Sequence, residues 1–237
     1  MKTNIVTPLL ALTAALTGQC LALTPVLEEF TNGQFDETHF YQYNVGNAKL
    51  VQGNDKLNLT VLPDFTKDDF VSVELLTSYP GYSESWQMTV DLTNTSNAGK
   101  NAGCGFMIFN YADRSDFLYV DFYGISGVKA GILVNGKDAA VGKLSTKVGA
   151  PKGGIRVRFD AVTKLMSFSV SLTDKSEGYK WVKIGTFSPT GKGGNVRANW
   201  KIKPAGQFGI QLFGFGHKQK VKSGKVSLDN LAVTPIQ

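Results

Sequence analysis

The clearest pattern in this sequence is an alternation of apolar and polar residues with period two, in short stretches between residues 47 and 234. The apolar positions of four such stretches are Leu57, Leu59 and Val61; Trp86, Met88, Val90 and Leu92; Leu118, Val120 and Phe122; and Ile155, Val157 and Phe159. This period places the apolar side chains of each segment on one face of a β-strand. Gly, Asn or Asp separates the stretches, and no long helical pattern lies between them. The sequence therefore predicts an all-β fold of antiparallel sheets.

The predicted strands are too many for an immunoglobulin-type sandwich and favour a large two-sheet jelly roll. They are expected at 26–30, 48–52, 56–62, 70–77, 83–92, 103–110, 117–123, 129–134, 139–144, 155–160, 165–172, 179–187, 207–216 and 225–233. Asn135-Gly136 is a strong two-residue hairpin signal. Residues 33–43 are expected to be an irregular aromatic crossing segment, and a helical turn is expected around 196–200, inside the Gly- and Pro-rich stretch 188–205.

The first 22 residues have the features of a secretory signal peptide. Lys2 supplies the positive start, 8–16 the apolar core, and Cys20-Leu21-Ala22 a small-residue cleavage site. The apolar run is shorter than a membrane-spanning helix. We therefore expect an exported protein, secreted or periplasmic or otherwise extracellular, without a transmembrane segment. Residues 23–237 contain no linker and are expected to form one domain.

Cysteine usage limits how the exported chain is stabilised. Cleavage after residue 22 would remove Cys20 and leave Cys104 alone, so no internal disulfide could form. A metal site built on several thiolates is excluded for the same reason. Cys104 lies in the apolar run 103–109, which predicts a small buried residue rather than a reactive thiol.

The order of several segments resembles a known family. Glu28-Glu29-Phe30 comes early, an aromatic segment precedes Gly46, and the strand at 56–62 follows a glycine. In the middle, 105–109 is followed by 117–120, and at the end 207–210 is followed by 226–231. Together these segments resemble the concanavalin A-like lectin/glucanase (laminin-G-like) domains, over nearly all of the mature chain. The resemblance implies a jelly roll of two curved sheets that holds carbohydrate on the concave face or in the loops at its rim.

The same resemblance implies a structural calcium ion. Many members of the family carry Ca²⁺ between the N-terminal acidic segment and the aspartate of the last strand, and Glu29 and Asp229 occupy these positions. Ca²⁺ prefers carboxylate and carbonyl oxygens and tolerates irregular geometry. Alternatively, Asp229 only shapes a turn or pairs with a lysine such as Lys225.

Strand parity, by which successive side chains point to opposite faces of a strand, also identifies the polar side chains that face away from the core. If Leu118 and Val120 point into the core, Tyr119 and Asp121 point away from it. Aromatic rings beside carboxylate, amide and guanidinium groups suit a sugar, whose C–H patches stack while its hydroxyls form directed hydrogen bonds. The candidate carbohydrate-binding residues chosen in this way are Gln87, Asp91, Tyr119, Asp121, Tyr123, Arg156 and Gln211. Alternatively, these residues are only the solvated sides of half-exposed strands.

These residues leave three classes of function open. We expect first a lectin-like protein that binds a polysaccharide or glycoconjugate without catalysis. A polysaccharide hydrolase or lyase is the second class, but family glucanases carry Glu-x-Asp-x-x-Glu on one strand and this sequence has no such run. Residue types for a lyase are present, including Tyr119, His39 and His217, without the family's lyase motifs, so we assign no catalytic residue. The third class is an envelope scaffold or interaction protein.

Charge and tryptophan positions add two further expectations. The net charge is +6, and the basic run 217–225 is predicted to be a solvated hairpin tip that could attract anionic polysaccharide. Nucleic acid is a poor fit, because no recognition module of interleaved basic and aromatic residues is present.

Trp181 alternates with Val182 in a position that allows exposure, and Trp200 lies in the longest irregular loop, where a binding role is expected.

Overall fold

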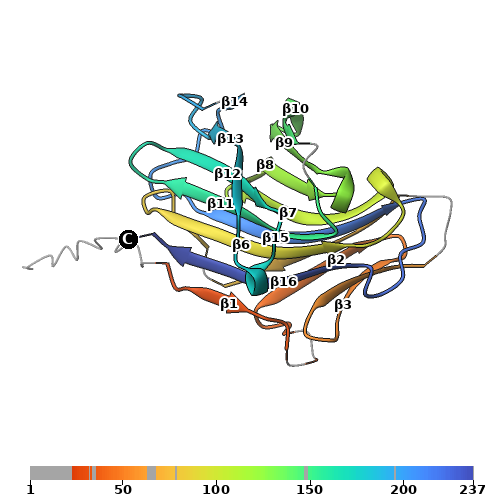
Figure 1. Cartoon of the computed structure of the whole chain (residues 1–237). Helices are drawn as coiled ribbons and strands as arrows, with labels where there is room; N and C mark the ends of the chain where they lie inside the picture. The colour runs from red at the N-terminus through yellow and green to blue at the C-terminus, as the bar shows by residue number, and fades with distance from the viewer. Residues whose placement is uncertain are drawn as a thin grey trace, which may run out of the picture.

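The alternating stretches form β-strands in two packed layers in the computed structural model (Figure 1). The structure describes residues 23–236 except 32, 34–35, 63–67, 78, 147–148 and 195, and it describes no side chains at 68, 140–146 and 196–197. The predicted signal segment 1–22 therefore lies outside the described residues. No helix in the described ranges is long and apolar enough to span a membrane.

The described part of the chain consists of β-strands and short 3-10 helices connected by turns and loops. The strands are β1 (Val26–Glu28), β2 (Phe40–Val45), β3 (Ala48–Gln52), β4 (Leu57–Val61), β5 (Asp68–Leu75), β6 (Trp86–Asn94), β7 (Ala102–Asn110), β8 (Asp113–Phe122), β9 (Val128–Val134), β10 (Lys137–Thr146), β11 (Lys152–Asp160), β12 (Leu165–Ser171), β13 (Trp181–Ser188), β14 (Val196–Arg197), β15 (Phe208–His217) and β16 (Val226–Pro235). The 3-10 helices are η1 (Gly99–Asn101), η2 (Gly124–Ser126) and η3 (Lys175–Glu177).

Two sheets form the sandwich. The nine-stranded sheet has the order β14-β13-β12-β11-β6-β16-β4-β3, with β1 paired to β16. The seven-stranded sheet has the order β10-β9-β8-β7-β15-β5-β2. All pairs are antiparallel in the described strands except β13 with β14. In Figure 1 the terminal strands β2 and β3 lie at one end of the sandwich and β10 and β14 at the other. The predicted two-sheet antiparallel jelly roll is confirmed.

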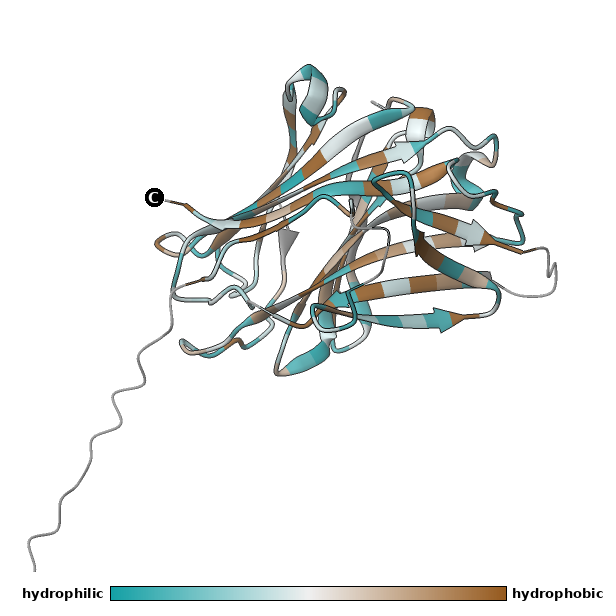
Figure 2. Cartoon of the chain, turned by 90° about the horizontal axis from the view of Figure 1, so that it is seen from below, coloured by the Kyte–Doolittle hydropathy of each residue, from teal (hydrophilic) through white to brown (hydrophobic). Residues whose placement is uncertain are grey.

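The core lies between the two sheets and follows the predicted parity. Ile155, Val157 and Phe159 of β11 are fully buried, whereas Arg156 and Arg158 between them are half-buried and exposed. Figure 2 shows the resulting alternation of hydrophobic and hydrophilic residues along the strands. Burial of so many apolar side chains stabilises the fold, and Cys104, the cysteine of the described ranges, forms no disulfide.

Cys104 is a packing residue of this core, as predicted. Its side chain is completely buried, and burial raises the pKa of the thiol. A thiol that stays protonated is a poor nucleophile, so Cys104 contributes volume rather than chemistry.

Residues 40–45 form strand β2, whereas the sequence predicted that the irregular segment 33–43 would include the first part of this range. Phe40 points into the core and pairs with Leu75 of β5, while Tyr41 and Tyr43 are exposed. The aromatic residues on both faces of β2 conceal the polar–apolar alternation that identifies the other strands.

The predicted helical turn at 196–200 is wrong. Val196 and Arg197 form β14 beside β13, and a β-bridge joins Thr190 to Asn199. The expected binding role of Trp200 is also wrong, because its side chain is only 1% exposed. Its indole Nε1 donates a hydrogen bond to the Leu133 carbonyl oxygen at 3.0 Å, so this loop is anchored into the core by a satisfied aromatic residue.

Candidate functional site

The outer face of the seven-stranded sheet carries the aromatic and polar row that the parity argument selected. Leu118 and Val120 of β8 are fully buried in the core, and Tyr119 and Asp121 lie on the opposite side of the strand. The predicted parity of β8 is therefore confirmed. The binding role of these side chains stays a prediction.

Strand pairing extends this row across the sheet. Because residues opposite each other in neighbouring strands point to the same face, the registers define two polar rows. The first row runs from β8 to β2 through Tyr119, Met107, Gln211, Glu74 and Tyr41. The second row contains Asp121, Gly105, Phe213, Ser72 and Tyr43. Gln211, predicted from parity alone, thus lies in the same row as Tyr119.

Glycines allow the aromatic rings of this face to lie against the sheet. A Cβ at Gly103 would lie 2.9 Å from Phe215 Cζ, and one at Gly105 would lie 3.0 Å from Phe213 Cζ. The two rings therefore cover the glycines of the neighbouring strand β7. Both phenylalanines are almost completely buried, so their rings lie close to the sheet rather than protruding from it.

A hollow of about 320 Å³ opens on this face, and we call it the Glu74 hollow. Its lining combines aromatic, carboxylate, guanidinium and amide groups. The lining residues are Tyr41, Tyr43, Phe70, Ser72, Glu74, Met107, Arg114 and Gln211. These residues come from β2, β5, β7, β8 and β15, so strands far apart in the sequence build a single surface.

The floor of the Glu74 hollow is a hydrogen-bonded cluster. Arg114 donates from both terminal nitrogens to the Glu74 carboxylate, at 2.7 Å and 2.8 Å, and Gln211 Nε2 donates to the same carboxylate at 3.1 Å. Glu74 is 5% exposed, so these three bonds compensate for the burial of its charge. The hydrogen bond to Glu74 raises the pKa of the Arg114 guanidinium. The cluster therefore holds polar groups of both signs in fixed positions.

Aromatic side chains surround this polar floor. Tyr41 and Tyr43 are 58% and 55% exposed on the edge strand β2. The Arg114 guanidinium lies 4.8 Å from the centre of the Phe109 ring and 6.0 Å from that of Tyr111. Exposed rings beside fixed hydrogen-bonding groups can stack against an amphipathic ligand and orient its hydroxyls.

Asp121 is a buried carboxylate on the same face. The Tyr123 hydroxyl donates to Asp121 Oδ2 at 3.0 Å, and Asp121 pairs across strands with Lys129. Burial raises the pKa of Asp121 to about 6, although the Tyr123 bond and the Lys129 charge lower it. Burial also raises the pKa of Tyr123, which therefore stays protonated at neutral pH.

Gln87, Asp91 and Arg156 do not join this site, although the sequence analysis grouped them with it. They belong to β6 and β11 of the nine-stranded sheet and point to its outer face, on the opposite side of the sandwich. Parity assigns a side chain to the core or to the outside, but it does not say which sheet a strand joins. The single predicted set is therefore divided between two faces.

Glu29 and Asp229, the predicted calcium ligands, both lie close to Lys175, and their role in calcium binding stays a prediction. Lys175 Nζ donates to Glu29 Oε1 at 2.8 Å and to Asn230 Oδ1 at 3.2 Å, so an ammonium group supplies the positive charge next to Glu29. Burial raises the pKa of Asp229, whose Oδ1 accepts a hydrogen bond from the backbone of Asn230. Among the described residues, no group of three or more His, Cys, Asp and Glu side chains could hold a metal ion.

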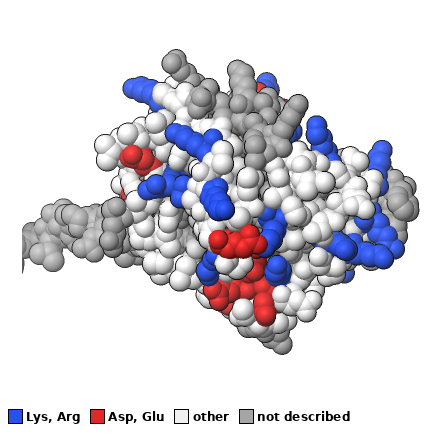
Figure 3. All heavy atoms as spheres, viewed as in Figure 1, with Lys and Arg blue, Asp and Glu red and all other residues white. Residues whose placement is uncertain are grey.

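Acidic side chains nevertheless gather on this side of the molecule, over the region of β16 (Figure 3). Asp91 and Asp229 are direct cross-strand partners in β6 and β16. Asp91 Oδ2 accepts hydrogen bonds from the Lys175 backbone at 3.1 Å and from Asn230 Nδ2 at 2.9 Å. Burial is the main cause of the raised pKa of Asp91. These contacts attach the η3 loop to the sheet.

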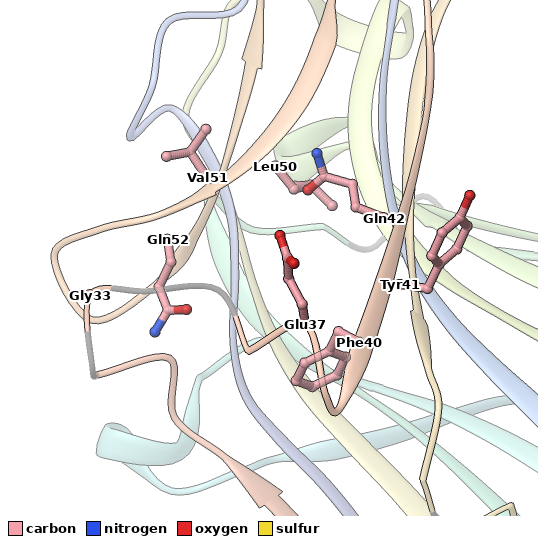
Figure 4. A pocket seen from close by; sticks show the side chains of 8 residues that line it. All are labelled: Gly33, Glu37, Phe40, Tyr41, Gln42, Leu50, Val51 and Gln52. Carbon is pink, nitrogen blue, oxygen red and sulfur yellow. The ribbon is translucent and has the colours of Figure 1, made fainter.

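A second and larger hollow, of about 520 Å³, lies between the edge strands β2 and β3 (Figure 4). Glu37 points into it, and Tyr41 points away from Gln42 on the same strand. Its lining offers one carboxylate and the amides of Gln42 and Gln52, but no exposed pair of aromatic rings. The Glu74 hollow is therefore the better-equipped site for an amphipathic ligand.

The sequence analysis missed Glu74, Arg114, Tyr41 and Tyr43. The spacing of Tyr41 and Tyr43 places two aromatic rings on one strand face, and this signal was available. Glu74 alternates with the core residues Val73 and Leu75, so parity could have placed it outside the core. Arg114 gave no such signal, because its partner lies 40 residues away in sequence.

Comparison with known proteins identifies the fold. No family model and no curated protein matches the sequence. Among solved structures, the chain is similar to the VIP36 exoplasmic/lumenal domain in its Ca²⁺/Man3GlcNAc-bound form, with a TM-score of 0.54 and 10% identity over 90% of this chain and 88% of that one. It is similar to lectin UEA-II complexed with galactose, with a TM-score of 0.56 and 11% identity over 89% and 98% of the two chains.

The Lotus tetragonolobus seed lectin gives the same result, with a TM-score of 0.55 and 10% identity over 90% of this chain and 98% of that one. Each similarity covers nearly the whole length of both chains, at identities that show the fold alone. The two antiparallel sheets and these structural neighbours agree with the family resemblance of the sequence. The chain has the concanavalin A-like lectin jelly-roll fold.

Proposed function

We propose that the protein binds a glycan on the outer face of its seven-stranded sheet, in the Glu74 hollow and along the adjoining row of Tyr119, Asp121 and Tyr123. The observation that carries the proposal is the combination of a fixed polar floor with exposed rings in one hollow. Glu74, Arg114 and Gln211 are already oriented by one another, so a sugar would lose little binding energy to their ordering.

The residue types of this face match the chemistry of a sugar. Tyr41 and Tyr43 offer ring faces to C–H patches, and the carboxylates of Glu74 and Asp121 can accept hydrogen bonds from hydroxyls. Two of the structural neighbours were solved with Man3GlcNAc and with galactose. Their fold supports the proposal, while the residues of this chain decide the ligand.

A glycan array followed by titration of the best oligosaccharide tests the proposal. The variant Tyr41→Ala/Tyr43→Ala should weaken binding about thirty-fold, since each of the two stacked rings contributes about 1 kcal/mol. Because both rings are more than half exposed, the melting temperature should change little. Gln211→Ala should weaken binding in the same assay, since it removes an amide from the floor of the hollow.

Leu27→Ala/Val51→Ala is the matched control, since both side chains are exposed apolar residues of other strands, 74% and 50% accessible. Full binding by the control and weak binding by the tyrosine variant would support the proposal. A tyrosine variant with an unchanged array profile would contradict it, and so would a wild-type protein that binds no glycan.

Cleavage of a polysaccharide is the second candidate function. The observation in its favour is the Asp121 carboxyl beside Tyr123, because its pKa of about 6 would let it take up and release a proton near neutral pH, as a general acid or base does. A lyase would produce unsaturated ends that absorb ultraviolet light, and a hydrolase would produce reducing ends. Incubation of the ligand with the protein and measurement of both products separates these reactions from binding alone.

We further propose export of the mature chain from about Leu23. The signal-like features of residues 1–22 support this, and the VIP36 domain among the neighbours is exoplasmic or lumenal. N-terminal sequencing of the protein recovered outside the cytoplasm should begin near residue 23. Recovery of the intact chain in the cytoplasm would contradict the proposal.

Calcium is tested separately. Ca²⁺-bound forms occur among the structural neighbours, but Lys175 occupies the region between Glu29 and Asn230 in this chain. We therefore propose that the lysine, rather than calcium, connects the N-terminal segment to the last strand. A chelator that lowers the melting temperature would contradict this proposal.

A further inference from the structure

The outer face of the nine-stranded sheet carries three cations that surround a row of serines. Arg156 and Arg158 point outward from β11, and Lys183 lies opposite Ser169 of the neighbouring strand β12. We call this surface the basic trough and define it by Arg156, Arg158, Ser167, Ser169 and Lys183. Basic side chains are visible in the region of β11 and β12 in Figure 3. The trough lies on the opposite side of the sandwich from the Glu74 hollow.

The shape of the trough follows from the small side chains of β12. Ser167 pairs with Arg158 of β11 and with Thr186 of β13, and Ser169 pairs with Arg156 and Lys183. Long side chains therefore stand on both sides of a row of hydroxyls. A hollow of about 590 Å³ lies at the Arg158 end of the trough, where its lining includes Arg158, Ser167, Lys183 and Thr186 together with Asp160.

The cations of the trough lack acidic partners in the described part of the chain. None of the ion pairs found there involves Arg156, Arg158 or Lys183. Arg156 Nε is buried and has no hydrogen-bond partner, which is unusual for a guanidinium donor. Asp160 is close enough to Arg158 for an electrostatic interaction. Its carboxylate already accepts hydrogen bonds from the backbone N–H groups of Val162 and Thr163, in the turn that follows β11. The buried, unpartnered Arg156 donor, together with two exposed cations outside the described ion pairs, indicates a site for an anion.

Aromatic rings lie at one end of the trough. The Arg156 guanidinium lies 4.4 Å from the centre of the Trp181 ring, and Trp181 packs against Tyr179 with ring centres 4.5 Å apart. The indole holds the guanidinium in place. Anion binding therefore costs less side-chain conformational entropy here than it would at a freely rotating arginine. Trp181 was predicted from sequence to allow exposure, and it is half-buried.

The spacing of the cations favours a polymer with repeated charges over a single small anion. Arg156 and Arg158 are two residues apart on one strand, or about 7 Å, and β11 and β13 are separated by about 10 Å. Three cations spread over these distances can each bind a different charged group of one polymer. The serine hydroxyls between the cations provide hydrogen bonds for the uncharged groups of a chain that runs through the trough.

We propose that the basic trough binds an acidic polysaccharide through its sulfate or carboxylate groups. This site is independent of the glycan proposed for the seven-stranded sheet. A bilayer surface fits it less well, because the Arg156 donor is buried inside a trough and a planar membrane would contact only the protruding ends of Arg158 and Lys183.

The experiment measures binding of dextran sulfate and of polygalacturonate, which separate sulfate from carboxylate recognition, with neutral dextran as the uncharged comparison. The variant Arg158→Ser/Lys183→Ser should weaken binding to at least one of the two polyanions by about ten-fold or more, because two charge-assisted contacts are lost. Both residues are exposed, so the variant should fold normally. Raising the salt concentration should weaken wild-type binding.

The matched control is Lys49→Ser/Lys137→Ser, which removes the same charge from exposed positions outside the trough and outside the basic run 217–225. Polyanion binding that survives in the control but not in the trough variant would support the proposal. Equal loss in both variants would show attraction by net charge alone and would overturn it, and so would binding only to single-stranded DNA or to anionic phospholipid vesicles.

The two proposed sites can be told apart in the same assay. The variant Tyr41→Ala/Tyr43→Ala should keep its affinity for the polyanion, and Arg158→Ser/Lys183→Ser should keep its affinity for the glycan found on the array. Loss of polyanion binding in the tyrosine variant would place that ligand on the seven-stranded sheet and would overturn the proposal for the trough.

Discussion

Replacement of Asp121 by Asn tests the physical account of the seven-stranded face. Asp121 is 8% exposed and lies among aromatic side chains, with the Tyr123 hydroxyl as a hydrogen-bond donor. Its ionised form is disfavoured by burial, which raises its pKa from 3.8 to about 6 in spite of the nearby Lys129. The Asn side chain has nearly the same shape and still offers an oxygen to Tyr123, but it carries no charge.

The magnitude and sign follow from proton linkage. The folded state binds the Asp121 proton more tightly than the unfolded state, so ionisation costs stability as the pH rises from about 4 to about 6. A shift from 3.8 to about 6 corresponds to about 3 kcal/mol once the group is fully ionised in both states. Asp121→Asn should therefore have nearly wild-type stability at pH 4 and exceed it by about 3 kcal/mol at pH 7.5.

Urea denaturation of both proteins across this pH range measures the difference. Asp138→Asn is the control, because Asp138 is exposed on β10 and the substitution removes the same charge. Wild-type and Asp121→Asn stabilities that run parallel from pH 4 to pH 7.5 would refute the reasoning. A variant that is more stable but binds the glycan less well would show that the buried charge is retained for binding.

Three further predictions concern packing and calcium. Gly105→Ala should lower the free energy of unfolding by about 2–3 kcal/mol, because its Cβ would overlap the Val120 carbonyl oxygen and crowd Phe213; wild-type stability in urea would contradict the packing described for this face. Trp200→Phe should lower the free energy of unfolding by about 1–3 kcal/mol, because the Leu133 carbonyl oxygen loses its indole donor. An unchanged thermal midpoint would mean that water replaces this hydrogen bond. Addition of a chelator should leave the melting temperature unchanged, whereas a clear decrease would establish a bound cation.

Local patterns in the sequence were sufficient for much of the fold. The period-two alternation of residues such as Ile155, Val157 and Phe159 depends only on neighbouring positions, and the Asn135-Gly136 turn has positive φ angles of 50° and 69°, as a two-residue hairpin turn requires. Parity also placed Tyr119 outside the core. These features need no knowledge of distant segments.

The candidate site depends on contacts that local patterns do not contain. Glu74 forms hydrogen bonds with Arg114, 40 residues away in sequence, and with Gln211, 137 residues away. The strand order brings these three residues together. For the same reason parity grouped Arg156 with Tyr119, although the two lie on different sheets. The burial of Trp200 is also non-local, because its indole donates a hydrogen bond to the Leu133 carbonyl oxygen, 67 residues away in sequence.

The central claim is that a glycan binds to the outer face of the seven-stranded sheet. Titration of the isotope-labelled protein with the oligosaccharide chosen by the array, followed by nuclear magnetic resonance, tests it most directly. The account predicts that the signals of Tyr41, Glu74, Tyr119 and Gln211 shift together with a single affinity. Shifts confined to the nine-stranded sheet, with these four residues unchanged, would contradict it.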